Sequence, residues 1–229
     1  GIGVTGPVAQ PATAAFDDQW NGSNQLVCSD LAIGEKEDTW KNSCQWKTGT
    51  ISHAPEVLKY RPTAESSTAF ALYRTDVYKE ADHAYEAAIA SAQESIDAIH
   101  VNFSADIICL LNLIAPDTCT YENNALPWMR AVVEAVEKNH VKVRVIVENA
   151  NSNGLENRVG IDMLEKELAA RGLGDLVEVR FFNGRVHMKS ALIDRQMLFV
   201  GSQNFHYSSF SPGGLLEFVA ATDSQAAIE

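Results

Sequence analysis

The stretch that most constrains the fold is residues 185–204, which read as two short strands joined by a polar turn. Apolar residues recur up to Ile193, the polar turn covers 194–196, and a second apolar run covers 198–200. A hairpin returns its second strand to the end at which the first strand began. The sequence therefore predicts a hairpin whose open end gathers the residues that precede the first strand and those that follow the second.

An imidazole, an ammonium and a carboxamide fall at that open end. His187 and Lys189 are two residues apart, so they would lie on one face of a strand, and Asn204 follows the second strand. A histidine can attack phosphorus or transfer protons near neutral pH, while a lysine and an amide can hold anionic oxygens. Each residue alone would more often be an ordinary surface or strand-end group, so the prediction of a phosphate site depends on their joint spacing.

The spacing of six residues resembles the HKD motif of the phospholipase D superfamily: His187, Lys189, Asp194, Gly201, Ser202 and Asn204. Family members also place a glutamate one short loop further on, and Glu217 stands there. The resemblance implies a phosphodiesterase that works through a phosphohistidine intermediate. Lysines supply the positive charge in such a site, so it implies neither a metal nor a cofactor.

The resemblance also implies a role for each polar residue. His187 would be either the nucleophile or the general acid, and Glu217 would accept a hydrogen bond from its Nδ1 and fix its tautomer. Asp194 belongs to the catalytic motif, although its place in the turn favours a structural role. Three side chains would bind the substrate phosphate: Lys189, Ser202 and Asn204.

Family members build one active site from two HKD motifs, in tandem or across a symmetric dimer, and this sequence holds one. A second His-x-Lys pair, His140 and Lys142, has Val147 where the aspartate belongs, so we interpret it as a helix-to-strand junction. We therefore expect a second HKD-bearing chain or fragment as partner. A heterodimer of two halves is favoured over a homodimer, and an inactive half-domain used for binding is the least favoured arrangement.

The net charge of −12 and the scattered basic residues disfavour a nucleic-acid substrate, because nucleic-acid binders usually present a basic surface. A phospholipid or another small phosphodiester is the favoured substrate, with hydrolysis or transphosphatidylation as the reaction. Two alternatives stay open: a symmetric homodimeric single-motif endonuclease, and a catalytically inactive secreted binding module.

Cysteines and glycosylation sequons indicate the compartment. The four cysteines suggest two local disulfides out of three possible pairings, Cys28–Cys44 and Cys109–Cys119, and sequons begin at Asn21 and Asn102. These features favour a secreted, extracellular setting, with reduced cysteines in a cytosolic protein as the alternative. No apolar run approaches the ~20 residues that cross a bilayer.

Residues 1–55 are rich in small and polar residues with little periodicity, which predicts an N-terminal arm, and residues 56–229 form the HKD half-domain. Strands are expected at 69–73, 95–103, 141–147, 177–182 and 215–222 besides the hairpin, and helices at 76–93, 126–139 and 158–171. This alternation predicts an α/β fold with a mixed β-sheet flanked by helices. His100 is expected to be a hydrogen-bonded structural histidine, and residues 222–227 read as the start of a helix that is cut.

Overall fold

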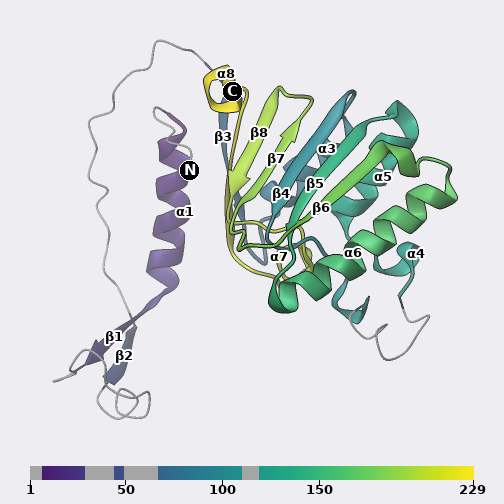
Figure 1. Ribbon diagram of the computed structural model, residues 1–229. Coiled ribbons are helices and arrows are strands. Elements are labelled where there is room, and N and C mark those ends of the chain that lie inside the picture. The colour runs from purple at the N-terminus through teal and green to yellow at the C-terminus, as the bar shows by residue number, and fades with distance from the viewer. Residues whose placement is uncertain (1–6, 29–43, 49–66, 110–118) are drawn as a thin grey trace. The chain divides into compact units, whose positions relative to one another are not determined.

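The computed structural model describes residues 7–28, 44–48, 67–109 and 119–229 (Figure 1). These residues fall into two compact units, one within the first 62 residues and the other from residue 67 onward. Each unit is described by itself.

The N-terminal unit contains a helix that the sequence did not predict. Helix α1 (Ala9–Gly22) precedes the antiparallel strands β1 (Asn24–Cys28) and β2 (Cys44–Thr48). Pro11 lies in the first turn of α1, where the backbone N–H groups have no helical acceptor in any case, so it does not interrupt the helix. Several alanines then give this segment high helix propensity.

Two predictions fall on side chains of this unit that the structure does not describe, those of Asn21 and Cys28. The strand register makes Cys28 and Cys44 backbone partners, which is the arrangement that a local bridge needs. The Cys28–Cys44 disulfide and the glycosylation of Asn21 stay predictions.

The second unit is built on a seven-stranded mixed sheet of order β3-β9-β8-β7-β4-β5-β6. Strands β4, β5 and β6 are parallel, and the remaining neighbours pair antiparallel. The strands are β3 (Ala69–Arg74), β4 (Ser95–His100), β5 (Lys142–Glu148), β6 (Val177–Phe182), β7 (Lys189–Ile193), β8 (Met197–Gly201) and β9 (Glu217–Thr222). The predicted α/β class with a mixed sheet is confirmed.

The helices of this unit are α3 (Glu80–Ala90), α4 (Tyr121–Asn124), α5 (Pro127–Asn139), α6 (Asn151–Ala170), the 3-10 turn η2 (Gly174–Leu176), α7 (Tyr207–Phe210) and α8 (Gln225–Ile228). Alternate side chains of β5, such as Val145, pack into one core with Ile89 of α3, Trp128 of α5 and Leu164 of α6. The intervening side chains of β5, such as Arg144, are exposed on the other face of the sheet. No helix in the described ranges is long and apolar enough to cross a membrane.

Two helix starts differ from the sequence prediction. Helix α3 begins at Glu80, because the Thr75 hydroxyl accepts the N–H groups of Val77 and Tyr78 and holds that segment in a turn. Helix α6 begins at Asn151, seven residues before the predicted start at residue 158. The amide of Asn153, in its first turn, donates to Glu148 at the end of β5, so the polar residues tie the helix start to the sheet.

The hairpin at the centre of the sequence prediction is confirmed as β7 and β8. Its turn places Asp194 and Arg195 in the left-handed region, with φ of 52° and 55°, as tight hairpin turns require. The discounted His-x-Lys pair is a helix-to-strand junction: His140 is the C-cap of α5 and Lys142 begins β5.

Candidate active site

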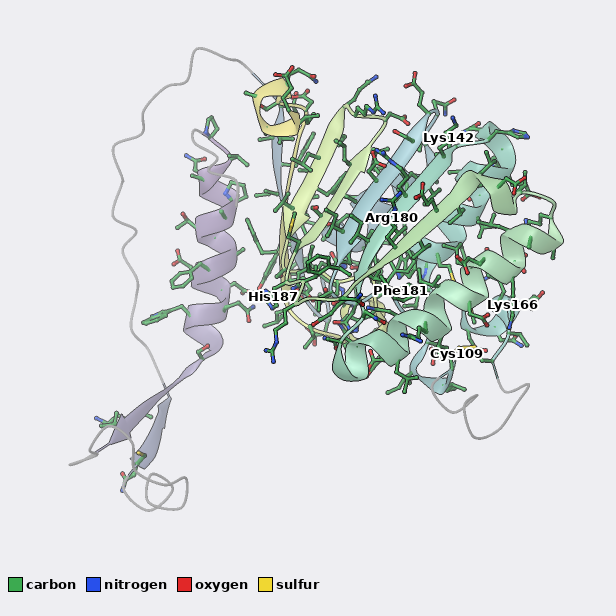
Figure 2. All side chains as sticks on the ribbon, viewed as in Figure 1. Cys109, Lys142, Lys166, Arg180, Phe181 and His187 are labelled. Atoms are coloured by element: carbon green, nitrogen blue, oxygen red, sulfur yellow. A yellow bond between two sulfur atoms is a disulfide. The ribbon has the colours of Figure 1, made fainter. Side chains whose placement is uncertain are left out.

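The strand register brings the motif residues to one edge of the sheet. Lys189 pairs with His100 of β4, Gly201 at the end of β8 pairs with Val219 of β9, and the first residue of β9 is Glu217. His187 lies just outside this edge, and Figure 2 shows it at the end of the sheet opposite Lys142.

His187 lies in the segment that precedes β7, so strand alternation does not place it on the same face as Lys189. Its imidazole is exposed and has no hydrogen-bond partner among the residues that the structure describes. Lys189, the first residue of β7, is only 8% exposed, and its Nζ donates to the carbonyl oxygen of His187 at 3.3 Å. The shared face therefore stays a prediction, but the two residues lie together, one open to solvent and one buried.

Lys189 is the buried cation of the site. Burial lowers the pKa of its ammonium, and the negative charge of Glu217 acts in the opposite direction. A phosphodiester that bound beside Lys189 would supply a further negative charge. Ligand binding would therefore favour the charged form of this lysine.

Glu217 is 5% exposed and is held by two serine hydroxyls. Ser202 Oγ donates to Oε2 at 2.5 Å, and Ser209 Oγ donates to Oε1 at 2.6 Å. In the described part of the chain the hydrogen bonds to Glu217 come from these serines, and the expected bond from His187 is not formed. Ser202 also accepts the N–H of Phe218 at 3.0 Å, so its hydroxyl positions the carboxylate and β9 as well as facing the site.

Asn204 follows β8 and is half-buried, and its Oδ1 is buried with no hydrogen-bond partner among the described residues. Buried amide oxygens are normally paired, and within the described residues the neighbouring Oε1 of Gln203 is unpaired as well. An anionic phosphate oxygen would be bound by the N–H groups of the Asn204 amide and not by Oδ1.

Packing explains why the motif has a glycine at position 201. A Cβ at this position would lie 2.3 Å from the carbonyl oxygen of Phe218 and 2.7 Å from the Cα of Val219. Glycine therefore lets β8 and β9 approach closely just before the segment that delivers Ser202 and Asn204.

Asp194 lies at the other end of β7, about 16 Å from Lys189 along the strand. Its carboxylate accepts the backbone N–H groups of Gln93, Glu94 and Ser95 at 2.7–3.1 Å. Partial burial would raise the pKa of Asp194, but these three bonds hold it below its usual value. This position favours the structural role and places Asp194 away from any phosphate held by Lys189.

His100 is a buried imidazole beside the site. Its ring stacks on Phe205 with centroids 4.1 Å apart, and within the described residues neither ring nitrogen has a partner, in contrast to the hydrogen-bonded histidine that was expected. Burial lowers the pKa of His100 to about 3, and the positive charges of Lys189 and His206 add to this effect. His206 was not singled out from the sequence, although it follows Asn204 by only two residues.

A fully buried arginine also supports the site and was missed. Arg74 donates to Asp82 at 2.8 Å, to the carbonyl of Leu215 at 2.7 Å and to the carbonyl of Ser211 at 2.5 Å. Gln203 of the motif donates to Asp82 at 2.6 Å. These partners are far apart in sequence, so local patterns contain no signal for the cluster, which fixes the loop before Glu217.

The remaining predicted site residues lie away from this edge or beside it. Cys109 and Cys119 form the predicted disulfide. The half-buried amide of Asn102 donates to Asn153 and Glu156 at 3.2 and 3.4 Å, so a glycan on this nitrogen would have to displace both contacts. No group of three or more potential metal ligands occurs within the described segments.

Comparison with solved structures gives several similar folds. The chain is 19% identical to Nuc from Salmonella typhimurium, a phospholipase D family member (TM-score 0.49, 71% of this chain and 88% of that chain), and 18% identical to NucT from Helicobacter pylori (0.47, 71% and 89%). It is 11% identical to phosphatidylserine synthase from Haemophilus influenzae Rd KW20 (0.48, 80% and 38%). No curated protein sequence matches the chain significantly.

The sequence also matches a family model described as cardiolipin synthase, phospholipase D-like domain, over residues 85–229. The match covers more than half of the chain and includes the whole motif from His187 to Asn204, together with Glu217. The chain therefore belongs to the phospholipase D-like family.

Proposed function

We propose that this chain supplies one half of a phospholipase D-type active site, which cleaves a phospholipid or another small phosphodiester. The second HKD motif comes from another chain or fragment. One observation carries the proposal: an exposed imidazole (His187), a buried ammonium (Lys189) and a carboxamide (Asn204), whose N–H groups can donate to phosphate oxygens, lie at one edge of the sheet, beside the fixed carboxylate of Glu217.

In the proposed reaction one histidine forms a P–N bond while the P–O bond to the leaving alkoxide breaks. The other histidine protonates that alkoxide and then takes a proton from the water or alcohol that attacks the phosphohistidine. His187 takes one of these two roles, because its ring is open to an incoming substrate. The ammonium of Lys189 and the amide N–H groups of Asn204 stabilise the charge that develops on the non-bridging oxygens.

A phospholipid substrate is supported by the surroundings of the motif. Apolar side chains that are about half exposed occur next to His187 and just before Glu217, and another ends β6 at the same edge: Met188, Leu215, Leu216 and Phe182. The net charge of −12 opposes binding to a long polyanion. The family model that matches residues 85–229 is described as a cardiolipin synthase domain, and cardiolipin is a phospholipid.

Two variants that change the same residue type test the catalytic proposal. His187→Asn should lower phosphodiester turnover by about 10⁴-fold or more, because it removes the nucleophile or the acid. His140→Asn is the matched control, since His140 has a left-handed backbone that asparagine tolerates and lies at the opposite end of the sheet. It should turn over like the unmodified chain. Turnover retained by His187→Asn, measured with bis(4-nitrophenyl) phosphate and with a phospholipid, would refute the assignment.

The native mass of the active protein tests the partner. A complex of this chain with a different polypeptide that carries His-x-Lys supports the heterodimer of two halves. Twice the chain mass, with cleavage of nucleic acid in preference to phospholipid, would instead support the homodimeric endonuclease. A monomer that binds ligand without turnover would support the remaining alternative, a catalytically inactive binding module.

We also propose an oxidising, extracellular setting. The Cys109–Cys119 disulfide supports it, because such bonds are rare in reducing compartments. Mass measurement without reductant on protein from its natural source should find these cysteines paired, and free thiols would contradict the proposal.

A further inference from the structure

A second imidazole lies on the segment that follows the motif glycine. From Ser202 to His206 burial alternates: Gln203 and Phe205 are completely or almost completely buried, while the residues between them are half-buried or exposed. The backbone of His206 is extended, with φ −145° and ψ 168°. Because side chains alternate along an extended chain, His206 lies on the same side as Ser202 and Asn204.

The inward side of this segment is fixed by packing. The carbonyl of Phe205 accepts the N–H of Ser104 at 2.7 Å, and its ring stacks against His100 and Trp128. Gln203 is held by its hydrogen bond to Asp82. The outward side is therefore presented on a rigid support, as a binding site requires.

The hydrogen-bonding state of His206 follows from its contacts. Its Nδ1 accepts the backbone N–H of Ser208 at 3.0 Å and caps helix α7. Burial lowers the pKa of His206 to about 4, and the nearby charge of Lys189 adds to this effect. The ring is therefore neutral at pH 7, and its single hydrogen is on Nε2. This N–H has no acceptor among the residues that the structure describes.

We propose that His206 binds the substrate phosphate, its Nε2–H donating a hydrogen bond to a non-bridging oxygen alongside Lys189 and Asn204. The inference rests on the proposed function and adds a residue to it. A neutral Nε2–H donor cannot attack phosphorus and does not compete with His187 for a proton. The two imidazoles thus have separate tasks, one chemical and one that binds charge.

Two substitutions separate the two ring nitrogens. In His206→Asn the amide oxygen stands near the position of Nδ1 and can still cap α7, but the donor at Nε2 is lost. In His206→Gln the longer side chain carries an N–H to the region of Nε2, while the cap is lost. A purely structural histidine would be rescued by asparagine, whereas a phosphate donor would be rescued by glutamine.

The experiment uses the full chain in its active assembly, with bis(4-nitrophenyl) phosphate as substrate and calorimetric titration of inorganic phosphate. We expect His206→Asn to lower kcat/KM by about 10- to 100-fold and to weaken phosphate binding, with an unchanged melting temperature. His206→Gln should recover most of kcat/KM and melt at a lower temperature. Unchanged kcat/KM and phosphate affinity in His206→Asn would overturn the inference, and so would equal losses of activity and stability in both variants. An unmodified protein that neither turns over the diester nor binds phosphate would instead refute the proposed function itself.

Discussion

The two ends of the motif hairpin differ in how far their polar groups are satisfied. At the turn, three backbone N–H groups saturate the carboxylate of Asp194. At the open end, the imidazole of His187 and the Oδ1 of Asn204 have no partner within the described residues. One sequence motif therefore contains both a structural and a ligand-binding part. At the open end the exposed imidazole of His187 is the group that a substrate can reach.

The largest effect on kcat should come from a substitution at the open end of the hairpin. Lys189→Gln is expected to lower kcat by about 10²–10³-fold, because it removes a buried cation that faces the developing negative charge. Lys142→Gln changes the lysine of the discounted His-x-Lys pair at the other end of the sheet and is the control. Steady-state kinetics on both variants decide the point. Equal rates would mean that the two ends do not differ in function.

Substitutions of Asp194 in the turn should lower the free energy of unfolding and leave kcat unchanged. Asp194→Ala leaves three backbone N–H groups without their acceptor and should lower the free energy of unfolding by about 3 kcal/mol. Asp194→Asn keeps one acceptor oxygen and the left-handed backbone, so it should cost less. Urea unfolding measures both. A fall in kcat per folded molecule would contradict the structural role.

Acid should destabilise the protein through the buried imidazole beside the open end. The pKa of His100 is about 3 in the folded chain and about 6.5 in the unfolded chain, so between these values only the unfolded state binds the proton. Stability should therefore fall as the pH drops, by about 2 kcal/mol between pH 7 and 5. Lys189 and His206 are the charged or titratable groups that act on His100, and the lowered pKa of His206 works in the same direction.

His100→Phe, which keeps an aromatic ring against Phe205, should remove about half of the combined pH dependence, because His206 supplies a contribution of similar size. Unfolding curves at the two pH values give the comparison. The same loss of stability in both proteins would show that another group is responsible.

The sequence located the hairpin and the motif residues because both depend on short, fixed spacings. Apolar alternation and a polar turn determine β7 and β8, and the same spacing assigns Lys189 and Asn204 to the open end. The resemblance identified Glu217, whose actual partners, Ser202 and Ser209, were not foreseen. Side-chain hydrogen bonds depend on rotamers and loops that spacing does not specify.

The features that the sequence did not reveal depend on long-range packing or on local competition. Helix α1 was hidden by a glycine- and proline-containing composition, and α3 starts late because the Thr75 hydroxyl takes its first donors. His206 follows the motif in a segment for which the sequence pattern predicted no helix or strand, and only the burial of Phe205 shows which way it faces. Arg74 meets partners that lie more than a hundred residues later in the chain.

The buried Arg74 determines where the autonomous folding unit must begin. The family match starts at residue 85, yet β3 pairs along the whole length of β9, and Arg74 anchors the loop that leads into Glu217. A fragment trimmed to the matched region would still pair β9 with β8, but it would leave the other side of β9 as an exposed sheet edge and the loop carbonyls without their donor. Such a fragment would keep every residue of the motif and lose the arginine that anchors the loop leading into Glu217.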